Sequence, residues 1–143
     1  MKQPFLRVIG VAIVLFATIT QLARAEVRPV CSASSIAGAY GFTLTGSYMQ
    51  TLYAISGRFV SNGKGALTGS ATQTVGGNIS TNGFTASYEV KADCTGTAVL
   101  SFDGGAQSSL SFTIVSNGQE VLMIDTDSGT VETGNAKRQF NPF

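Results

Sequence analysis

Short turn sequences recur along the whole length of this chain after residue 38 and separate segments rich in strand-forming residues, which is typical of all-β domains. Asn-Gly and Asp-Gly pairs are the most specific of them, because their residues adopt the positive φ values that tight β-hairpins require. No segment repeats apolar residues at helical spacing. We place turns at Gly46-Ser47, Asn62-Gly63, Gly76-Gly77-Asn78, Asn82-Gly83, Asp103-Gly104-Gly105, Asn117-Gly118 and Ser128-Gly129.

The segments between these turns predict eight strands, at about 39–45, 51–61, 65–75, 83–92, 96–102, 108–115, 120–126 and 129–138. Short links favour antiparallel pairing of consecutive strands. Such strands, with no helix to cover a face, form either a closed barrel or a two-sheet sandwich. Because Greek-key sandwiches need some long crossovers, the tight links favour an all-β, eight-stranded, antiparallel up-and-down β-barrel.

Apolar and polar residues alternate within the expected strands. Segment 83–92 places Phe84, Ala86, Tyr88 and Val90 on one face, opposite Thr85, Ser87, Glu89 and Lys91. In a barrel surrounded by water the apolar face lies inside, whereas a membrane barrel reverses the pattern. Residues counted back by twos from the terminal phenylalanine include Gln139 and Lys137, which cannot face lipid. We therefore expect an apolar interior.

The first 25 residues have the layout of a secretory signal. Lys2 and Arg7 precede an apolar run at 8–22, and small residues occupy both positions that a signal peptidase reads in Ala23-Arg24-Ala25. The apolar run is shorter than the roughly 20 residues that a membrane anchor needs. We therefore expect a signal peptide at 1–25, a single barrel domain at 26–143, and a secreted or periplasmic location.

Charge argues against nucleic acid and anionic membranes as partners. Cleavage would remove Lys2, Arg7 and Arg24 from nine basic residues and leave all eight acidic ones, for a net charge near −2. Both kinds of partner require a basic patch. The only adjacent basic residues after the signal are Lys137 and Arg138.

The two cysteines, Cys31 and Cys94, are expected to form a disulfide. In an oxidising compartment a pair of cysteines is normally bonded. A catalytic thiol would need a base, commonly histidine, and the chain has no histidine. The same absence argues against a zinc site, which needs four ligands. Two free thiols remain the alternative.

No motif predicts a metal ion or a cofactor. The stretch Asp125 to Gly129 resembles the start of a calcium loop, but Gly129 and Ala136 occupy positions where that loop needs oxygen ligands. The glycine-rich stretch SNGKGALTGS lacks the Lys-Ser/Thr pair and following helix of a phosphate-binding loop. Both stretches are interpreted as turns.

Seven aromatic residues fall on the apolar faces and are the candidate ligand-binding residues. They either fill the barrel, since eight strands enclose an interior just wide enough for side chains, or line a pocket for a small apolar ligand. They are Tyr40, Phe42, Tyr53, Phe59, Phe84, Tyr88 and Phe112.

Four stretches together resemble a family of uncharacterised secreted bacterial proteins: CSASSIAGAYGFTLTG, SGRFVSNGKGALTGS, FTASYEVKADCTGTAVLSF and FTIVSNGQEVLMIDTDSGTVETGNAKRQ. Ala86 stands where that family has glycine. The group is similar in outline to calycin-like and allene-oxide-cyclase-like barrels. Gly38-Ala39-Tyr40 resembles the Gly-x-Trp motif of lipocalins, with tyrosine replacing tryptophan, which implies that Arg138 stacks across Tyr40.

Three functions are compatible with these observations. The first is a binding protein that holds a small apolar ligand inside the barrel. The second is an envelope structural or interaction protein with a filled barrel and no ligand. The third and least favoured is a cyclase-like or isomerase-like enzyme, which needs a polar group inside the barrel, for example Glu89 or Arg58. The sequence assigns no catalytic residue.

Overall fold

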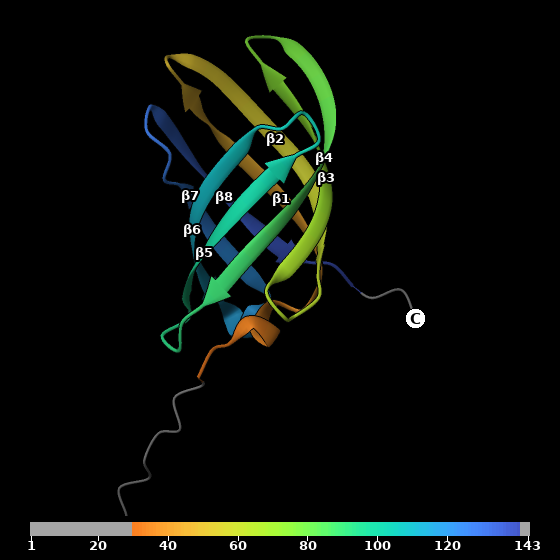
Figure 1. Cartoon of the computed structure of the whole chain (residues 1–143), viewed down its shortest axis with the longest axis vertical. Coiled ribbons are helices and arrows are strands. Elements are labelled where there is room, and N and C mark those ends of the chain that lie inside the picture. The colour runs from red at the N-terminus through yellow and green to blue at the C-terminus, as the bar shows by residue number, and fades with distance from the viewer. Residues whose placement is uncertain (1–29, 141–143) are drawn as a thin grey trace, which may run out of the picture.

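The computed structural model describes residues 30–140, which form a closed barrel of eight antiparallel strands in sequence order (Figure 1). This confirms the expected up-and-down barrel. The expected signal peptide at 1–25 lies outside the described residues. The strands and two short 3-10 helices are η1 (Ala33–Ile36), β1 (Gly38–Tyr48), β2 (Thr51–Ser61), β3 (Ala66–Val75), β4 (Asn78–Val90), β5 (Thr95–Phe102), β6 (Gln107–Val115), η2 (Ser116–Gly118), β7 (Glu120–Asp125) and β8 (Thr130–Arg138).

The turn expected at Gly46-Ser47 is wrong. Strand β1 continues to Tyr48, and the chain reverses at Met49 and Gln50, which have φ values of 45° and 70°. Two consecutive residues with positive φ match the twist of a tight hairpin, and here neither of them is glycine. Sequence patterns favour glycine and asparagine at such positions, so they missed this turn.

The turn expected at Asn82-Gly83 is also wrong, because β4 begins at Asn78. The preceding turn is made by Gly76 and Gly77, and β3 then pairs with β4 without interruption from Val75 opposite Asn78 to Ala66 opposite Ser87. Pairing between β4 and β5 starts only at Phe84. The β3–β4 hairpin therefore extends beyond the neighbouring β5–β6 hairpin (Figure 1).

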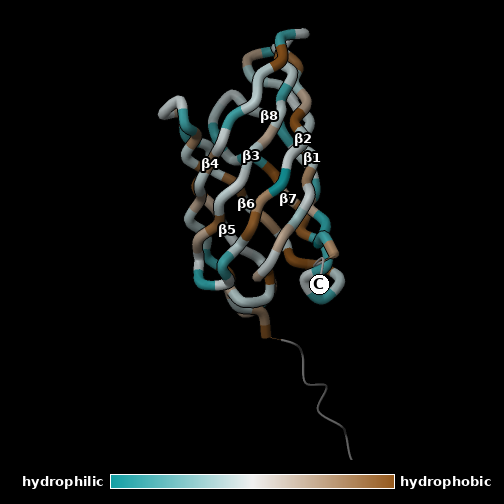
Figure 2. Tube along the Cα trace, turned by 90° about the vertical axis from the view of Figure 1, so that its right-hand side faces the viewer, coloured by the Kyte–Doolittle hydropathy of each residue, from teal (hydrophilic) through white to brown (hydrophobic). Residues whose placement is uncertain are grey.

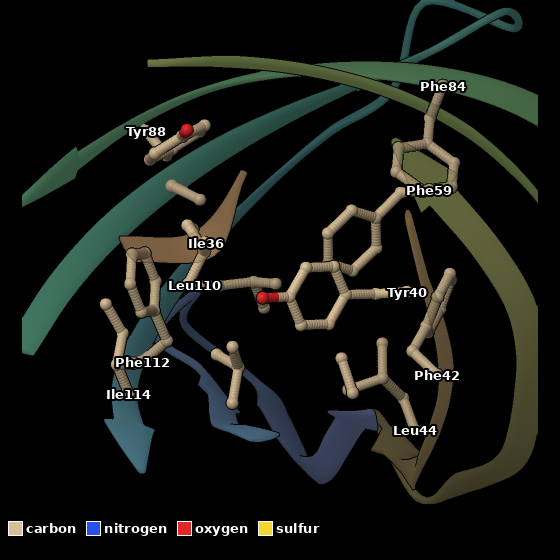
Figure 3. Close-up of a cluster of buried hydrophobic side chains, with 13 residues drawn as sticks. Ile36, Tyr40, Phe42, Leu44, Phe59, Phe84, Tyr88, Leu110, Phe112 and Ile114 are labelled. Carbon is tan, nitrogen blue, oxygen red and sulfur yellow. The ribbon is translucent and has the colours of Figure 1, made fainter. Parts of the chain in front are cut away.

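The apolar faces of the strands lie inside the barrel, as expected. Tyr40 stacks on Phe59 with ring centroids 5.1 Å apart, and Phe42 meets Phe84 edge-on at 5.9 Å (Figure 3). The alternation of apolar and polar residues along the strands is visible in Figure 2. The large buried core residues are Ile36, Tyr40, Phe42, Leu44, Phe59, Phe84, Tyr88, Leu110, Phe112, Ile114 and Val121.

Inward-facing glycines make room for these rings. A Cβ atom at Gly69 would lie 2.6 Å from Cζ of Phe84 and 2.9 Å from Cβ of Phe59, which is closer than real atoms approach. The ring of Phe84 therefore lies over the glycine backbone, beside the Cβ atom of Phe59. Alternation of very small and very large residues across adjacent strands packs the middle of the barrel.

One end of the barrel, the closed end, is covered by η1. The hydroxyl of Tyr88 donates to the carbonyl oxygen of Ala33, 3.1 Å away, and lies 2.7 Å from Oγ of Ser61. The disulfide between Cys31 and Cys94 is present and links the chain before η1 to the β4–β5 turn. Helix η1 is thus attached to the barrel by a covalent bond and by hydrogen bonds.

Arg138 completes the closed end, as the resemblance to lipocalins implied. Its guanidinium lies 4.9 Å from the centre of the Tyr40 ring. It donates to the carbonyl oxygens of Gly118 and Ser35, at 3.2 and 3.3 Å, and to that of Ala37. One side chain on the last strand therefore joins η1, η2 and β1.

The opposite, open end carries the β1–β2, β3–β4, β5–β6 and β7–β8 hairpins, and no helix of the described residues covers it (Figure 1). Among residues 30–140, no helix is both long enough and apolar enough to cross a membrane.

Candidate functional site

The structure separates the seven candidate aromatic residues into three groups. Phe42, Phe59, Phe84, Tyr88 and Phe112 line a cavity in the middle of the barrel, with a volume of about 50 Å³. Ligand sites usually measure roughly 300–1,000 Å³, so this cavity is too small for a ligand of ordinary size. These five residues act in the structure mainly as core.

Tyr40 and Tyr53 lie elsewhere. Tyr40 is completely buried at the closed end, where its hydroxyl donates to the carbonyl oxygen of Gly118 at 2.5 Å. Tyr53 is half-buried in the wall of a much larger cavity at the open end.

We call this second cavity the open-end cup. Its volume is about 540 Å³. Leu44, Leu100 and Leu110 line both the cup and the core cavity, so they form the floor between them. The side walls contain the aromatic residues Tyr48, Tyr53 and Phe102, the carboxylic acids Asp125, Asp127 and Glu132, and the polar residues Gln73, Gln107, Ser108, Ser128 and Thr130.

Glu132 is the one buried acidic residue among those that the structure describes, with 6% of its surface exposed. It faces inward from β8, whereas its neighbours Val131 and Thr133 face solvent. Gly46 on β1 lies directly between Glu132 on β8 and Tyr53 on β2. A Cβ atom at Gly46 would lie 2.9 Å from Cβ of Glu132, so the glycine leaves the space that Glu132 occupies.

Across this gap, the hydroxyl of Tyr53 and the carboxyl group of Glu132 lie close enough to influence each other's pKa. Burial raises the pKa of the Glu132 carboxyl, the nearby hydroxyl donor of Tyr53 opposes this rise, and the negative charge of Asp125 adds to it. Burial also raises the pKa of the Tyr53 hydroxyl, as do the nearby carboxylates of Glu132 and Asp125. Tyr53 is therefore a protonated donor at neutral pH.

Asp125 is held in the cup wall by two donors. Its carboxylate accepts hydrogen bonds from Oγ of Ser108 and from the backbone nitrogen of Asp127, both at 2.7 Å. Asp127 in turn accepts from the backbone nitrogen of Ser109 at 3.0 Å. The β7–β8 turn is thereby fastened to β6, and the Asp125 carboxylate has a defined position.

Charge is distributed unevenly between the two ends. No lysine or arginine lines the open-end cup. Every basic residue within 30–140 lies in the half of the barrel near the closed end: Arg58, Lys64, Lys91, Lys137 and Arg138. The open end instead carries Asp103, Asp125, Asp127 and Glu132. A cavity lined by charge of one sign concentrates the field of that sign.

Exposed apolar side chains surround the same end. Leu52 and Val131 are 74% and 75% exposed on the outer face of adjacent hairpins. We call this set the apolar rim; it comprises Tyr48, Met49, Leu52, Ile79, Ile124 and Val131. A gathering of apolar side chains in one exposed region is typical of an interaction site.

The two residues that the enzyme hypothesis placed inside the barrel, Glu89 and Arg58, are exposed on its outer surface. Glu132 is the interior carboxylate that the sequence reasoning missed. A signal was available, since Glu132 falls on the same face of its strand as Arg138, which the lipocalin resemblance already placed across Tyr40.

Metal binding has no support in the geometry. Within residues 30–140, no three histidine, cysteine, aspartate or glutamate side chains are grouped closely enough to hold a metal ion.

No family model and no curated protein matches the chain. The resemblance to a secreted bacterial family therefore stays a prediction. Solved structures of designed barrels are similar in fold. A de novo designed fluorescence-activating β-barrel has a TM-score of 0.57 and 15% identity, over 75% of this chain and 96% of its own. The redesigned barrel mFAP1, solved bound to DFHBI, has a TM-score of 0.54 and 23% identity, over 74% and 97%.

Proposed function

We propose that this protein is a secreted or periplasmic binding protein that holds a small, largely apolar molecule in the open-end cup. The observation that carries the proposal is the cup itself, with a volume of about 540 Å³ and a floor of leucine side chains. Ligand sites combine an apolar lining with a few polar groups that orient the ligand. Tyr53, Asp125 and Glu132 supply such groups here.

Two further observations support this function. The similar barrel mFAP1 is bound to DFHBI, so a designed barrel of this fold accommodates a small molecule. A disulfide suits an oxidising compartment, in agreement with secretion.

The proposal places the ligand nearer the open end than the candidate aromatic residues suggested. Of those residues, Tyr53 would touch the ligand directly, while Phe42, Phe59, Phe84, Tyr88 and Phe112 would support the leucine floor from below.

Filling the cup with a large side chain tests the proposal. Gln73 faces inward and lines the cup, so Gln73→Trp should occupy part of it. The neutral fluorescent probe naphthylmethanol should bind the wild-type protein saturably, and Gln73→Trp should weaken binding about tenfold or more, which corresponds to roughly 1.4 kcal/mol. Titration calorimetry measures both affinities.

Thr72→Trp is the matched control, because Thr72 is the exposed neighbour on the outer face of the same strand. It should leave probe affinity unchanged. Absence of saturable binding to the wild-type protein, or equal weakening by both variants, would contradict a ligand site in the cup.

The apolar rim also favours a second candidate, an envelope interaction protein whose partner covers the rim. Leu52, Ile124 and Val131 lie on the outer face of the barrel. A partner could therefore contact them without entering the interior. In that case Gln73→Trp would leave partner binding intact. The cup is the better-supported site because it combines apolar, aromatic and charged groups in one concave volume.

A further inference from the structure

We infer that the open-end cup selects organic cations, specifically molecules that carry a primary ammonium group on an apolar or aromatic body. This inference rests on the proposed function, since it concerns the same cup. It goes further by assigning the charge and the donor chemistry of the ligand. It also assigns Glu132 as the residue that binds the ammonium group.

The first step concerns the unused hydrogen-bonding capacity of Glu132. A carboxylate offers about four lone-pair sites. Among the described residues the hydroxyl of Tyr53 is the one side-chain donor near the Glu132 carboxylate, and Glu132 lies in the wall of the cup. An ammonium group carries three donors and no acceptor. It therefore matches the remaining acceptor sites of a buried carboxylate, and an alcohol or a hydrocarbon matches them less well.

The second step concerns charge. Burying a carboxylate without a nearby positive charge costs free energy. Within the described residues the cup has no basic side chain, and Asp125 adds a second negative charge to its wall. A cationic ligand would supply the missing countercharge. An anionic ligand would be repelled by Glu132, Asp125 and Asp127 together.

The third step concerns the apolar body of the ligand. Leu44, Leu100 and Leu110 provide an apolar floor beside the carboxylates. The rings of Tyr48, Tyr53 and Phe102 also line the cup, and aromatic rings attract ammonium groups. The cup thus offers apolar contact and cation recognition to one molecule, which a simple inorganic cation would not use.

A matched pair of probes tests the inference by titration calorimetry on the mature protein. Naphthylmethylamine is protonated at neutral pH, whereas naphthylmethanol has the same ring and no charge. The wild-type protein should bind the amine about tenfold or more tightly than the alcohol, as a hydrogen bond to a charged group predicts. Glu132→Gln should remove this preference, so that the amine and the alcohol bind the variant with about equal affinity.

Asp103→Asn is the control, because Asp103 is an exposed acidic residue at the same end of the barrel and does not line the cup. It should change neither affinity by more than about twofold, the effect of a screened surface charge. A salt series on the wild-type protein needs no variant: amine affinity should fall as salt rises, and alcohol affinity should not.

The outcomes separate this inference from the proposed function. Equal affinities of the wild-type protein for amine and alcohol, with both weakened by Gln73→Trp, would overturn cation selection and keep the cup as an apolar site. Preference for the amine that survives Glu132→Gln would also overturn the inference. Failure of the wild-type protein to bind either probe would overturn both.

Discussion

At the scale of single residues, the candidate site depends on two positions that face each other across a glycine. Glu132 and Tyr53 can meet only because Gly46, on the strand between them, has no side chain. The result is a buried carboxylate with a raised pKa beside a protonated tyrosine. Residues with perturbed pKa values in a cavity are typical of functional sites, and such residues commonly reduce stability.

We therefore expect Glu132→Gln to be more stable than the wild-type protein at neutral pH. The folded-state pKa of Glu132 lies above the ordinary value of 4.5, so the folded protein binds this proton more readily than the unfolded chain. The charged carboxylate thus destabilises the fold above its folded-state pKa, and the cost disappears as pH falls below 4.5. The advantage of Glu132→Gln in the free energy of unfolding should shrink over the same range.

Urea unfolding at a series of pH values measures this difference. Glu89→Gln removes the same charge from the exposed outer face and should change stability by no more than about 0.5 kcal/mol at neutral pH. A Glu132→Gln variant less stable than wild type at neutral pH would show that the carboxylate stabilises the barrel instead.

At the scale of elements, η1 is a small cover held on the barrel by a covalent bond. The helix has only four residues and contributes one buried apolar side chain, Ile36. Such a segment cannot stay ordered by its own hydrogen bonds. The Cys31–Cys94 disulfide, with a Cα–Cα distance of 4.9 Å and 63 residues of sequence separation, connects it to the β4–β5 turn.

Removing the disulfide with Cys31→Ala and Cys94→Ala together should lower the free energy of unfolding by about 4 kcal/mol, because the unfolded chain regains the freedom of a long loop. Urea unfolding of the oxidised wild-type protein and the double variant measures the loss. Binding of naphthylmethanol should persist in the folded variant, since the cup lies at the opposite end. A loss below about 1 kcal/mol would mean that the bond constrains the chain little.

At the scale of the whole molecule, the two ends of the barrel differ in covering, in charge and in the groups they expose. The closed end carries η1, η2, the disulfide and all basic residues of the described chain, and its contacts serve stability. The open end carries the cup, the acidic residues of its wall and the apolar rim. Closure of the barrel by β1–β8 pairing supports both ends, and Arg138 reinforces it.

Arg138→Lys should therefore destabilise the whole barrel by about 2 kcal/mol, because a lysine cannot reproduce the planar set of donors that reaches three carbonyl groups. Thermal and urea unfolding measure the change. Lys137→Arg, on the neighbouring exposed position, is the control and should be close to neutral. Equal stability of Arg138→Lys and wild type would mean that strand pairing alone closes the barrel.

The sequence by itself determined the strand number, the sequential pairing, the inward face of each strand and the disulfide. These properties follow from short-range patterns, such as the alternation through Phe84, Ala86 and Tyr88, and from the scarcity of alternatives for two cysteines. The sequence did not predict the turn at Met49-Gln50, because methionine and glutamine are not the usual turn-forming residues.

Only the tertiary structure decided where the barrel is filled and where it is hollow. The position of filled and hollow regions depends on the register of strand pairing. The register determines which residues of different strands lie side by side inside the barrel. The Phe84 ring packs over Gly69 beside Phe59, and Phe42 contacts both rings, which fills the middle. Glu132 and Tyr53 face each other across Gly46 at the open end, although 79 positions separate them in sequence. No local pattern contains that juxtaposition, because it arises only when the last strand closes against the first.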